Sequence, residues 1–197
     1  MKTLLLIAAL LASGQALAGA QKREPIDPVI LATLTARIAD KAPETFNFRH
    51  AEDAHKWIYA MSERLQRRIP DRKERVDLLK TIQFEALRNG LDPQLVLGLM
   101  EVESGFRRYA VSSAGARGLM QVMPFWTEVF KRPRDNLFHR RLNIRYGCAI
   151  LRYYLDLENG DYFRALGRYN GSLGRPEYPN MVLAAWKGRW QYDGATS

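Results

Sequence analysis

The sequence predicts an all-α protein, and three observations support this fold class. Apolar residues recur three and four positions apart along most of the chain, which is the spacing of one face of a helix. Aspartates stand before several of these runs as N-cap residues, and Asn-Gly pairs follow them as stop signals. No segment of convincing length alternates apolar and polar residues, as a half-buried strand would.

Residues 1–18 are typical of a secretory signal peptide. Lys2 provides a positive charge, residues 4–12 form an apolar stretch too short to span a bilayer, and Ala16-Leu17-Ala18 matches a cleavage site. An uncleaved anchor is the alternative, and the short apolar stretch argues against it. Gly19 follows the expected cut, so a lipoprotein would have no cysteine to modify. We therefore expect a soluble, exported, periplasmic protein with no membrane segment after cleavage.

The remaining residues suffice for one domain with a hydrophobic core. We expect residues 19–80 to form a small N-terminal helical extension that packs on a main domain, residues 81–197. The pattern breaks between Pro43 and Asn47, which is a candidate boundary between a small N-terminal part and the rest. The single cysteine, Cys148, lies in an apolar helical pattern and is expected to be a buried structural thiol.

Four helices are predicted in the first half of the chain. The first covers residues 26–39, and the second covers 49–69 and ends before Pro70. Asp71 caps a third helix, which stops at Asn89-Gly90. Asp92 caps a fourth helix, with proline at its first position, and this helix carries Glu103.

Shorter elements and one long helix are predicted in the second half. A short helix covers 119–123 and is ended by proline, and 125–130 adds another turn or two. A long helix covers 142–157. Asp161 caps a helix that reaches Asn170, and a last helix runs from 180 to about 187 after a loop rich in glycine and proline.

The net charge of +9 points to an acidic polymer as partner. Nucleic acid is one such polymer, but the export signal argues against it and favours the cell wall. A merely solvated basic surface is the alternative that charge alone leaves open.

Glu103 is the strongest candidate for catalysis. It ends a nearly all-apolar run, at the C-terminal end of its helix, where the helix dipole presents negative charge. Both effects disfavour the ionised carboxylate, so its pKa is expected to be raised, as a general acid near neutral pH requires. Glu101 lies about 200° away around the helix, so the two carboxyls point to opposite sides. Glu101 is expected to form an ion pair or face solvent.

A loop of small and polar residues follows, with glycines at 115 and 118. Together, Glu103-Ser104-x-Phe106 and the run Gly115-Ala116-x-Gly118-Leu119-Met120-Gln121-Val122-Met123-Pro124 resemble the signature of the SLT-type domain (soluble lytic transglycosylase, family 1). Two further blocks match in order and rough spacing: Asn143-Ile144-Arg145-Tyr146-Gly147 and Ala165-Leu166-x-x-Tyr169-Asn170-Gly171. The resemblance covers about residues 81–186.

The resemblance implies a goose-lysozyme-like helical fold and cleavage of peptidoglycan glycan strands between N-acetylmuramic acid and N-acetylglucosamine. Glu103 would be the single catalytic acid/base, with the substrate's N-acetyl group in place of a protein nucleophile, and the product would carry a 1,6-anhydro end. Substrate-assisted enzymes are a known exception to the two-carboxylate rule.

Further site residues follow from the same resemblance. Ser112, Gln121 and Met123 match positions that line the cleft, and Ser104 belongs to the same signature. The hydroxyl of Tyr169 would orient Glu103 or the acetamido group, with core packing as the alternative. Asn170 would hold the turn after it or contact substrate.

One segment departs from the family pattern. Many relatives carry a Glu-Thr-x-x-Tyr-Val motif near the end, and here the segment reads Pro176-Glu177-Tyr178-Pro179-Asn180-Met181-Val182. Tyr178 is a candidate for the motif's tyrosine, and Glu177 is a guess at a subsite residue.

No metal or cofactor is expected. His50, His55 and His139 lack the spacing of metal ligands, and no phosphate loop or dinucleotide fingerprint occurs.

Two other functions stay open: a hydrolytic muramidase on the same fold, and a non-catalytic wall-binding or assembly protein. A wall-spanning secretion, pilus or conjugation apparatus is a candidate partner, because small exported enzymes of this kind often open the wall for one.

Overall fold

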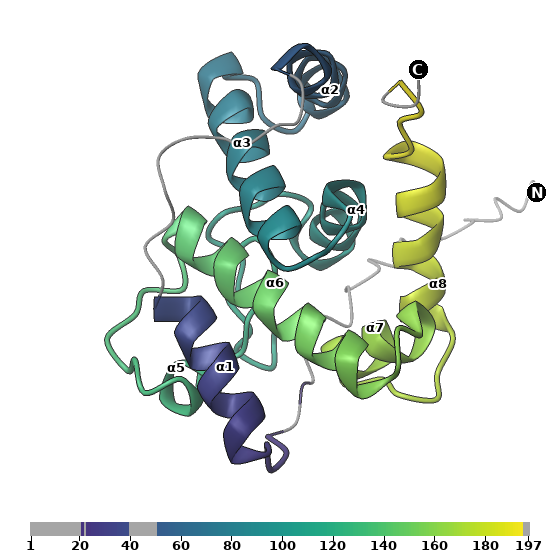
Figure 1. The fold of residues 1–197 in the computed structure, drawn as a ribbon. Coiled ribbons are helices and arrows are strands. Elements are labelled where there is room, and N and C mark those ends of the chain that lie inside the picture. Colours follow the sequence, from purple (N-terminus) through teal and green to yellow (C-terminus); the bar gives the residue numbers. More distant parts are fainter. Residues whose placement is uncertain (1–20, 22, 40–50, 195–197) are drawn as a thin grey trace, which may run out of the picture.

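The computed structural model describes residues 21, 23–39 and 51–194 (Figure 1). The predicted signal peptide and the predicted break between Pro43 and Asn47 lie outside these residues. The described part is helical, with no strand and with two isolated β-bridges, Val111–Arg117 and Arg117–Val122. The prediction of an all-α fold is confirmed.

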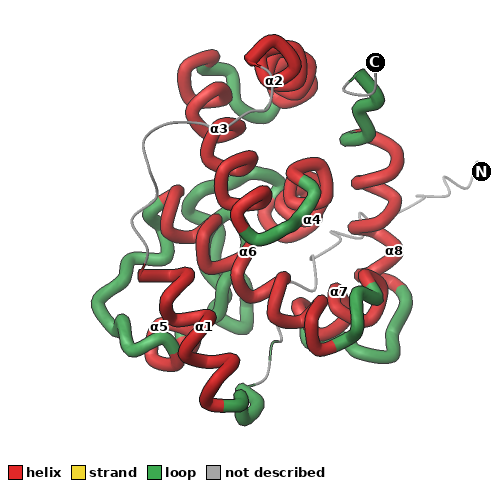
Figure 2. The backbone as a smooth tube through the Cα atoms, viewed as in Figure 1, coloured by secondary structure: helices red, strands yellow, loops and turns green. Residues whose placement is uncertain are grey.

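Eight α-helices follow one another in the described part, and the last continues into a five-residue π-helix. They are α1 Pro28–Ala39, α2 Ala51–Leu65, α3 Arg72–Arg88, α4 Pro93–Ser104, α5 Phe125–Val129, α6 Arg140–Leu157, α7 Tyr162–Asn170, α8 Glu177–Ala184 and η1 Ala185–Arg189. The loop between α4 and α5 lies against α6, and most of the remaining backbone is helix (Figure 2).

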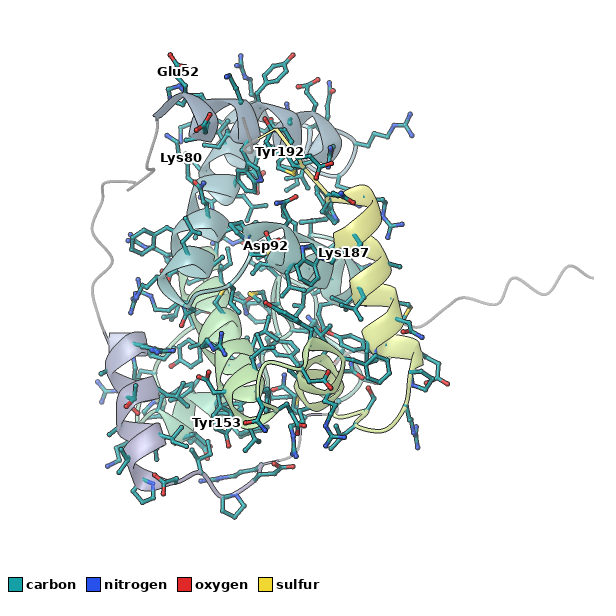
Figure 3. The ribbon with its side chains drawn as sticks, turned by 45° about the vertical axis from the view of Figure 1, so that its right-hand side comes forward. Glu52, Lys80, Asp92, Tyr153, Lys187 and Tyr192 are labelled. Atoms are coloured by element: carbon teal, nitrogen blue, oxygen red, sulfur yellow. The ribbon has the colours of Figure 1, made fainter. Side chains whose placement is uncertain are left out.

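Helix α4 lies at the centre of the molecule, between α3 and the C-terminal helix (Figure 1). Residues 95–100 are all buried. Gly98 permits close packing, since a Cβ there would lie 2.9 Å from the backbone nitrogen of Trp186. The Trp186 indole also donates to Asp92 at 2.8 Å, and Figure 3 labels Asp92 and the neighbouring Lys187 on these two segments. The helix that carries Glu103 is therefore held on several sides.

The predicted helix starts are confirmed at three aspartates. Asp71, Asp92 and Asp161 each accept a hydrogen bond from a backbone amide in the first turn of α3, α4 and α7. Gly105 ends α4 in the left-handed conformation at φ 58°, as a C-cap glycine does.

Other boundaries differ from the prediction. The second helix ends at Leu65, because residues 66–68 form a turn before the extended segment that leads to α3. Helix α6 begins at Arg140, two residues early, where the ring of His139 accepts a hydrogen bond from Leu142 N. The last helix begins at Glu177 and, with η1, reaches Arg189.

The helix predicted over 119–123 is wrong. Gln121 has a left-handed φ of 48°, and its amide donates to the carbonyl of Gly118 in a tight turn. Arg117 and Val122 then exchange both backbone hydrogen bonds. The segment is a small hairpin, which an apolar run of this length does not distinguish from a helical turn.

The last carbonyls of helix α1 accept hydrogen bonds from α3 and from α6, on which α1 packs. Arg88 donates to the Arg37 carbonyl, and Arg145 Nη1 donates to the Ile38 carbonyl at 3.4 Å. Arg145 also pairs at 3.0 Å with the fully buried Glu85, whose pKa is raised by desolvation. The predicted domain boundary at residue 80 falls inside α3, and the division there stays a prediction.

Candidate active site

Glu103 lies in the last turn of α4 and is only 4% exposed. The phenol of Tyr178, in the first turn of α8, donates a hydrogen bond to Glu103 Oε1 at 2.5 Å. The other carboxyl oxygen, Oε2, is buried and has no hydrogen-bond partner among the described residues. One oxygen is thus held by Tyr178, and the other has no competing hydrogen bond within the described residues.

The surroundings of Glu103 favour its neutral form near pH 7. Desolvation by burial raises its pKa to about 8, although the hydrogen bond from Tyr178 lowers it, since that bond favours the charged carboxylate. The direction agrees with the prediction from the apolar sequence before Glu103. A carboxyl with such a pKa is suited to general acid work near neutral pH.

Glu101 forms ion pairs on the opposite side of α4, as one of the two predicted alternatives. Its carboxylate pairs with Arg68 and accepts hydrogen bonds from Arg189 Nε at 2.9 Å and from the indole of Trp190 at 2.7 Å. These contacts tie the end of α4 to the turn after α2 and to the C-terminal segment. The back of the helix is therefore fixed while Glu103 faces the site.

Ser104 joins two segments of the backbone through its hydroxyl group. Its hydroxyl donates to the carbonyl of Leu119 at 2.7 Å and accepts from the amide of Phe106 at 3.1 Å. The residue is buried, and these bonds join the end of α4 to the loop before α5. The predicted contact of Ser104 with substrate stays a prediction.

The three predicted cleft residues that follow lie in or just after this loop. Gln121 is buried, and its side-chain Nε2 donates to the carbonyls of Ala110 at 3.1 Å and Gly118 at 2.9 Å. Ser112 is half-buried, and its hydroxyl accepts from the amide of Ala116 at 3.0 Å. Met123 is half-buried against the core. Gln121 and Ser112 therefore shape the loop through their own side chains.

Asn143 holds the loop before α5, a role that the sequence reasoning missed. Its side-chain oxygen accepts from Met120 N, and its nitrogen donates to the carbonyls of Arg117 and Leu137, each at 2.8 Å. Gly118 has φ 78°, and a Cβ on it would lie 2.5 Å from this amide nitrogen. The sequence offered a signal for this contact, because Asn143 and Gly118 both belong to blocks that resemble the SLT signature.

Two tyrosines, Tyr169 and Tyr178, lie near the end of α4, and only one of them contacts Glu103. The hydroxyl of Tyr169 donates to the carbonyl of Met120 at 2.8 Å, and the residue is fully buried. The phenol that contacts Glu103 is that of Tyr178, which the sequence marked only as a candidate. Asn170 is buried in the last turn of α7, and Glu177 is exposed at the start of α8.

A match to a known protein family accompanies this geometry. The family model described as Transglycosylase SLT domain matches residues 80–179, about half of the chain. The chain belongs to this family.

Several curated relatives of this SLT domain are named membrane-bound lytic murein transglycosylase C. The one from Photorhabdus laumondii is 35% identical over 112 residues, which cover 49% of this chain and 31% of the relative. That from Glaesserella parasuis is 42% identical over 82 residues, covering 37% and 22%. That from Actinobacillus pleuropneumoniae serotype 5b is 56% identical over 46 residues, covering 23% and 13%. The chain thus spans less than a third of each relative's length, and no solved structure matches it.

The matched SLT range contains every site residue from Glu103 to Tyr178. The partners of Glu101, which are Arg68, Arg189 and Trp190, lie outside it. Segments before and after the matched range therefore support the helix that carries the acid.

Metal-binding clusters and membrane-spanning helices are both absent from the described part of the chain. No group of three or more histidine, cysteine, aspartate or glutamate side chains gathers there as a metal site would require. His50 lies outside the described residues. None of the helices in that part combines the length and apolar character needed to cross a bilayer.

Proposed function

We propose that this protein is a peptidoglycan lytic transglycosylase with Glu103 as its single acid/base. The observation that carries the proposal is the Glu103 carboxyl, buried with a pKa of about 8, with Tyr178 on Oε1 and no partner on Oε2 among the described residues. Membership of the SLT family and relatives named as lytic murein transglycosylases support the same reaction.

The proposed reaction needs no water and returns its proton. Oε2 of the protonated acid gives its proton to the glycosidic oxygen while the bond from that oxygen to the muramyl anomeric carbon breaks. The carbonyl oxygen of the muramyl N-acetyl group stabilises the anomeric carbon. The Glu103 carboxylate then takes the proton of the muramyl 6-hydroxyl, whose oxygen bonds to the anomeric carbon and closes the 1,6-anhydro ring.

Substrate assistance fits the charges around the acid. A second carboxylate on the protein would be needed for the usual two-acid mechanism. Glu101, the nearest acid in sequence, is engaged by two arginines and an indole on the other side of α4. Tyr178 holds Oε1 so that the proton resides on Oε2.

The remaining site residues are proposed to act mainly through the loop. Gln121 and Ser112 hold the backbone that lines the cleft, Met123 and Asn170 complete its walls, and Tyr169 fixes the carbonyl of Met120. Export to the periplasm and service to a wall-spanning secretion, pilus or conjugation apparatus remain parts of this proposal that rest on the sequence.

Product analysis tests the proposal. Purified sacculi are digested with the wild-type protein and with Glu103→Gln, and the fragments are analysed by mass spectrometry. We expect 1,6-anhydro ends from the wild type and no fragments from the variant. Reducing ends would show a hydrolytic muramidase, and wall degradation that survives in Glu103→Gln would assign the activity to another group.

A further inference from the structure

An open recess of about 530 Å³ begins just beyond the end of α4 and is lined by residues 107–111. Two of its side chains are unusually exposed for their size, Tyr109 at 68% and Val111 at 60%. Large exposed aromatic and aliphatic groups beside a candidate active site often mark a binding surface. The recess lies outside the roles assigned so far.

Four side chains form a row along this surface, which we call the aromatic row: Arg108, Tyr109, Phe138 and Arg117. The guanidinium of Arg108 lies 5.2 Å from the ring centre of Tyr109, and that of Arg117 lies 5.9 Å from the ring centre of Phe138. The two rings are 6.0 Å apart. Arg108 Nε also donates to the Phe138 carbonyl at 3.1 Å. The exposed ring of Tyr109 and the half-buried ring of Phe138 are therefore ordered in advance, which reduces the entropy lost when a ligand binds.

The surroundings of the aromatic row are strongly basic. Residues 105–145 contain nine arginines and lysines and two acids, Glu128 and Asp135. Both acids are engaged, Glu128 with Arg23 at 3.6 Å and Asp135 with Arg132 at 2.6 Å. Neither arginine of the aromatic row forms an ion pair within the described residues. Two exposed guanidinium groups beside the rings of the aromatic row, with no ion-paired acid among the described residues, favour an anionic ligand.

The aromatic row is joined to the candidate active site by backbone contacts. The amide and the side-chain Nε of Arg107 both donate to the carbonyl of Ser104, the residue after Glu103. The carbonyl of Ala110 accepts from Gln121 Nε2 at 3.1 Å and from Gly118 N at 2.9 Å. A ligand that spans the recess and the acid therefore meets one connected surface.

We propose that the aromatic row is a subsite for glycan strands that still carry acidic stem peptides. A sugar ring packs on the exposed face of Tyr109, and Arg108 and Arg117 pair with free carboxylates of the peptide. This inference rests on the proposed function, and it adds a preference for peptide-bearing over peptide-free strands. An anionic lipid surface would meet the same charges, so the experiment includes it.

The test compares two glycans that differ only in their peptides: soluble strands from sacculi, and the same strands after an amidase has removed the stems. Binding is measured in the Glu103→Gln background, so that the result does not depend on turnover. We expect Arg108→Gln/Arg117→Gln to weaken binding of peptide-bearing strands about fivefold or more, with less than about twofold change for stripped strands, since exposed ion pairs are worth up to about 1 kcal/mol each. Added salt should shrink this difference.

Two further variants complete the design. Tyr109→Ala should weaken binding of both glycans, because both contain the sugar ring. Lys56→Gln/Arg72→Gln removes the same charge from exposed positions on α2 and α3 and should leave both affinities unchanged. Thermal unfolding of each variant confirms that it is folded.

Several results would overturn the inference. One is an equal loss of affinity for both glycans in Arg108→Gln/Arg117→Gln. Another is an unchanged affinity in that variant or in Tyr109→Ala. A third is that the arginine variant loses affinity for phosphatidylglycerol vesicles but not for peptide-bearing strands. Failure of the proposed function looks different. In that case, the wild type releases reducing ends or no fragments, while the preference for peptide-bearing strands persists in the binding assay.

Discussion

Replacing Glu103 by glutamine should stabilise the protein, and the gain should grow with pH. The carboxyl is neutral in the folded state up to a pKa of about 8, whereas an exposed glutamate in the unfolded chain ionises near 4.5. A raised folded pKa contributes stability that is fully present below the unfolded pKa and is lost as pH rises through the folded pKa. Glutamine does not titrate, so the free energy of unfolding of the variant does not fall with pH for this reason.

The size of the effect follows from the two pKa values. Between pH 5 and pH 8, ionisation of the unfolded chain should lower the free energy of unfolding of the wild type by about 3 kcal/mol relative to Glu103→Gln. For a chain of this size, about 1 kcal/mol moves Tm by roughly 2–4 °C, so the gap in Tm between the two proteins should widen by roughly 6–12 °C. Glutamine keeps an oxygen to accept the hydrogen bond from Tyr178, so the comparison isolates the charge.

The assay is thermal or urea unfolding of both proteins at pH 5 and pH 8. Glu101→Gln is the matched control, two residues away on the same helix. Its carboxylate pairs with Arg68 and Arg189, so this variant should have a lower free energy of unfolding at both pH values. A gap between wild type and Glu103→Gln that is the same at both pH values would refute the neutral, buried acid.

Three other predictions concern the reaction and the loop. On sacculi, kcat/KM should fall as pH rises through about 8, because the protonated acid is lost, and a rate that stays level far above that pH would contradict the assignment of Glu103. Tyr178→Phe removes a donor that favours the charged carboxylate, so the alkaline limb of the pH profile should move upward and kcat should fall; an unmoved limb would exclude the contact. Asn143→Ala leaves the Met120 amide and the Leu137 carbonyl without partners, while the Arg117 carbonyl keeps its bond from Val122, and it should lower the free energy of unfolding in urea by about 2–4 kcal/mol, with a loss under about 1 kcal/mol counting against its role.

Local signals were sufficient for much of the fold and for the acid. The caps at Asp71, Asp92 and Asp161 were predicted because a side chain and an amide two or three residues away decide them. The raised pKa of Glu103 followed from the apolar residues on its own helix. The groups that form each cap are close in sequence, whereas the full burial of Glu103 also needs Tyr178 from α8.

Short segments whose conformation depends on contacts with distant residues were predicted less well. The run from Leu119 to Met123 forms a tight turn because Asn143, from α6, binds the Met120 amide and the Arg117 carbonyl. The apolar pattern of these residues fits a helical turn equally well. The conformation of this segment depends on hydrogen bonds from Asn143, which lies more than twenty residues away in the sequence.

By itself, the sequence determined an all-α chain with one acid at the end of an apolar helix. Tertiary structure alone decided which phenol reaches that acid, because Tyr178 is 75 residues away along the chain. Helix α4 also approaches the C-terminal segment closely at Gly98, where a Cβ would lie 2.9 Å from the backbone nitrogen of Trp186. The contact between Tyr178 and Glu103 depends on how two packed surfaces fit together, and the residue spacing within either segment does not predict it.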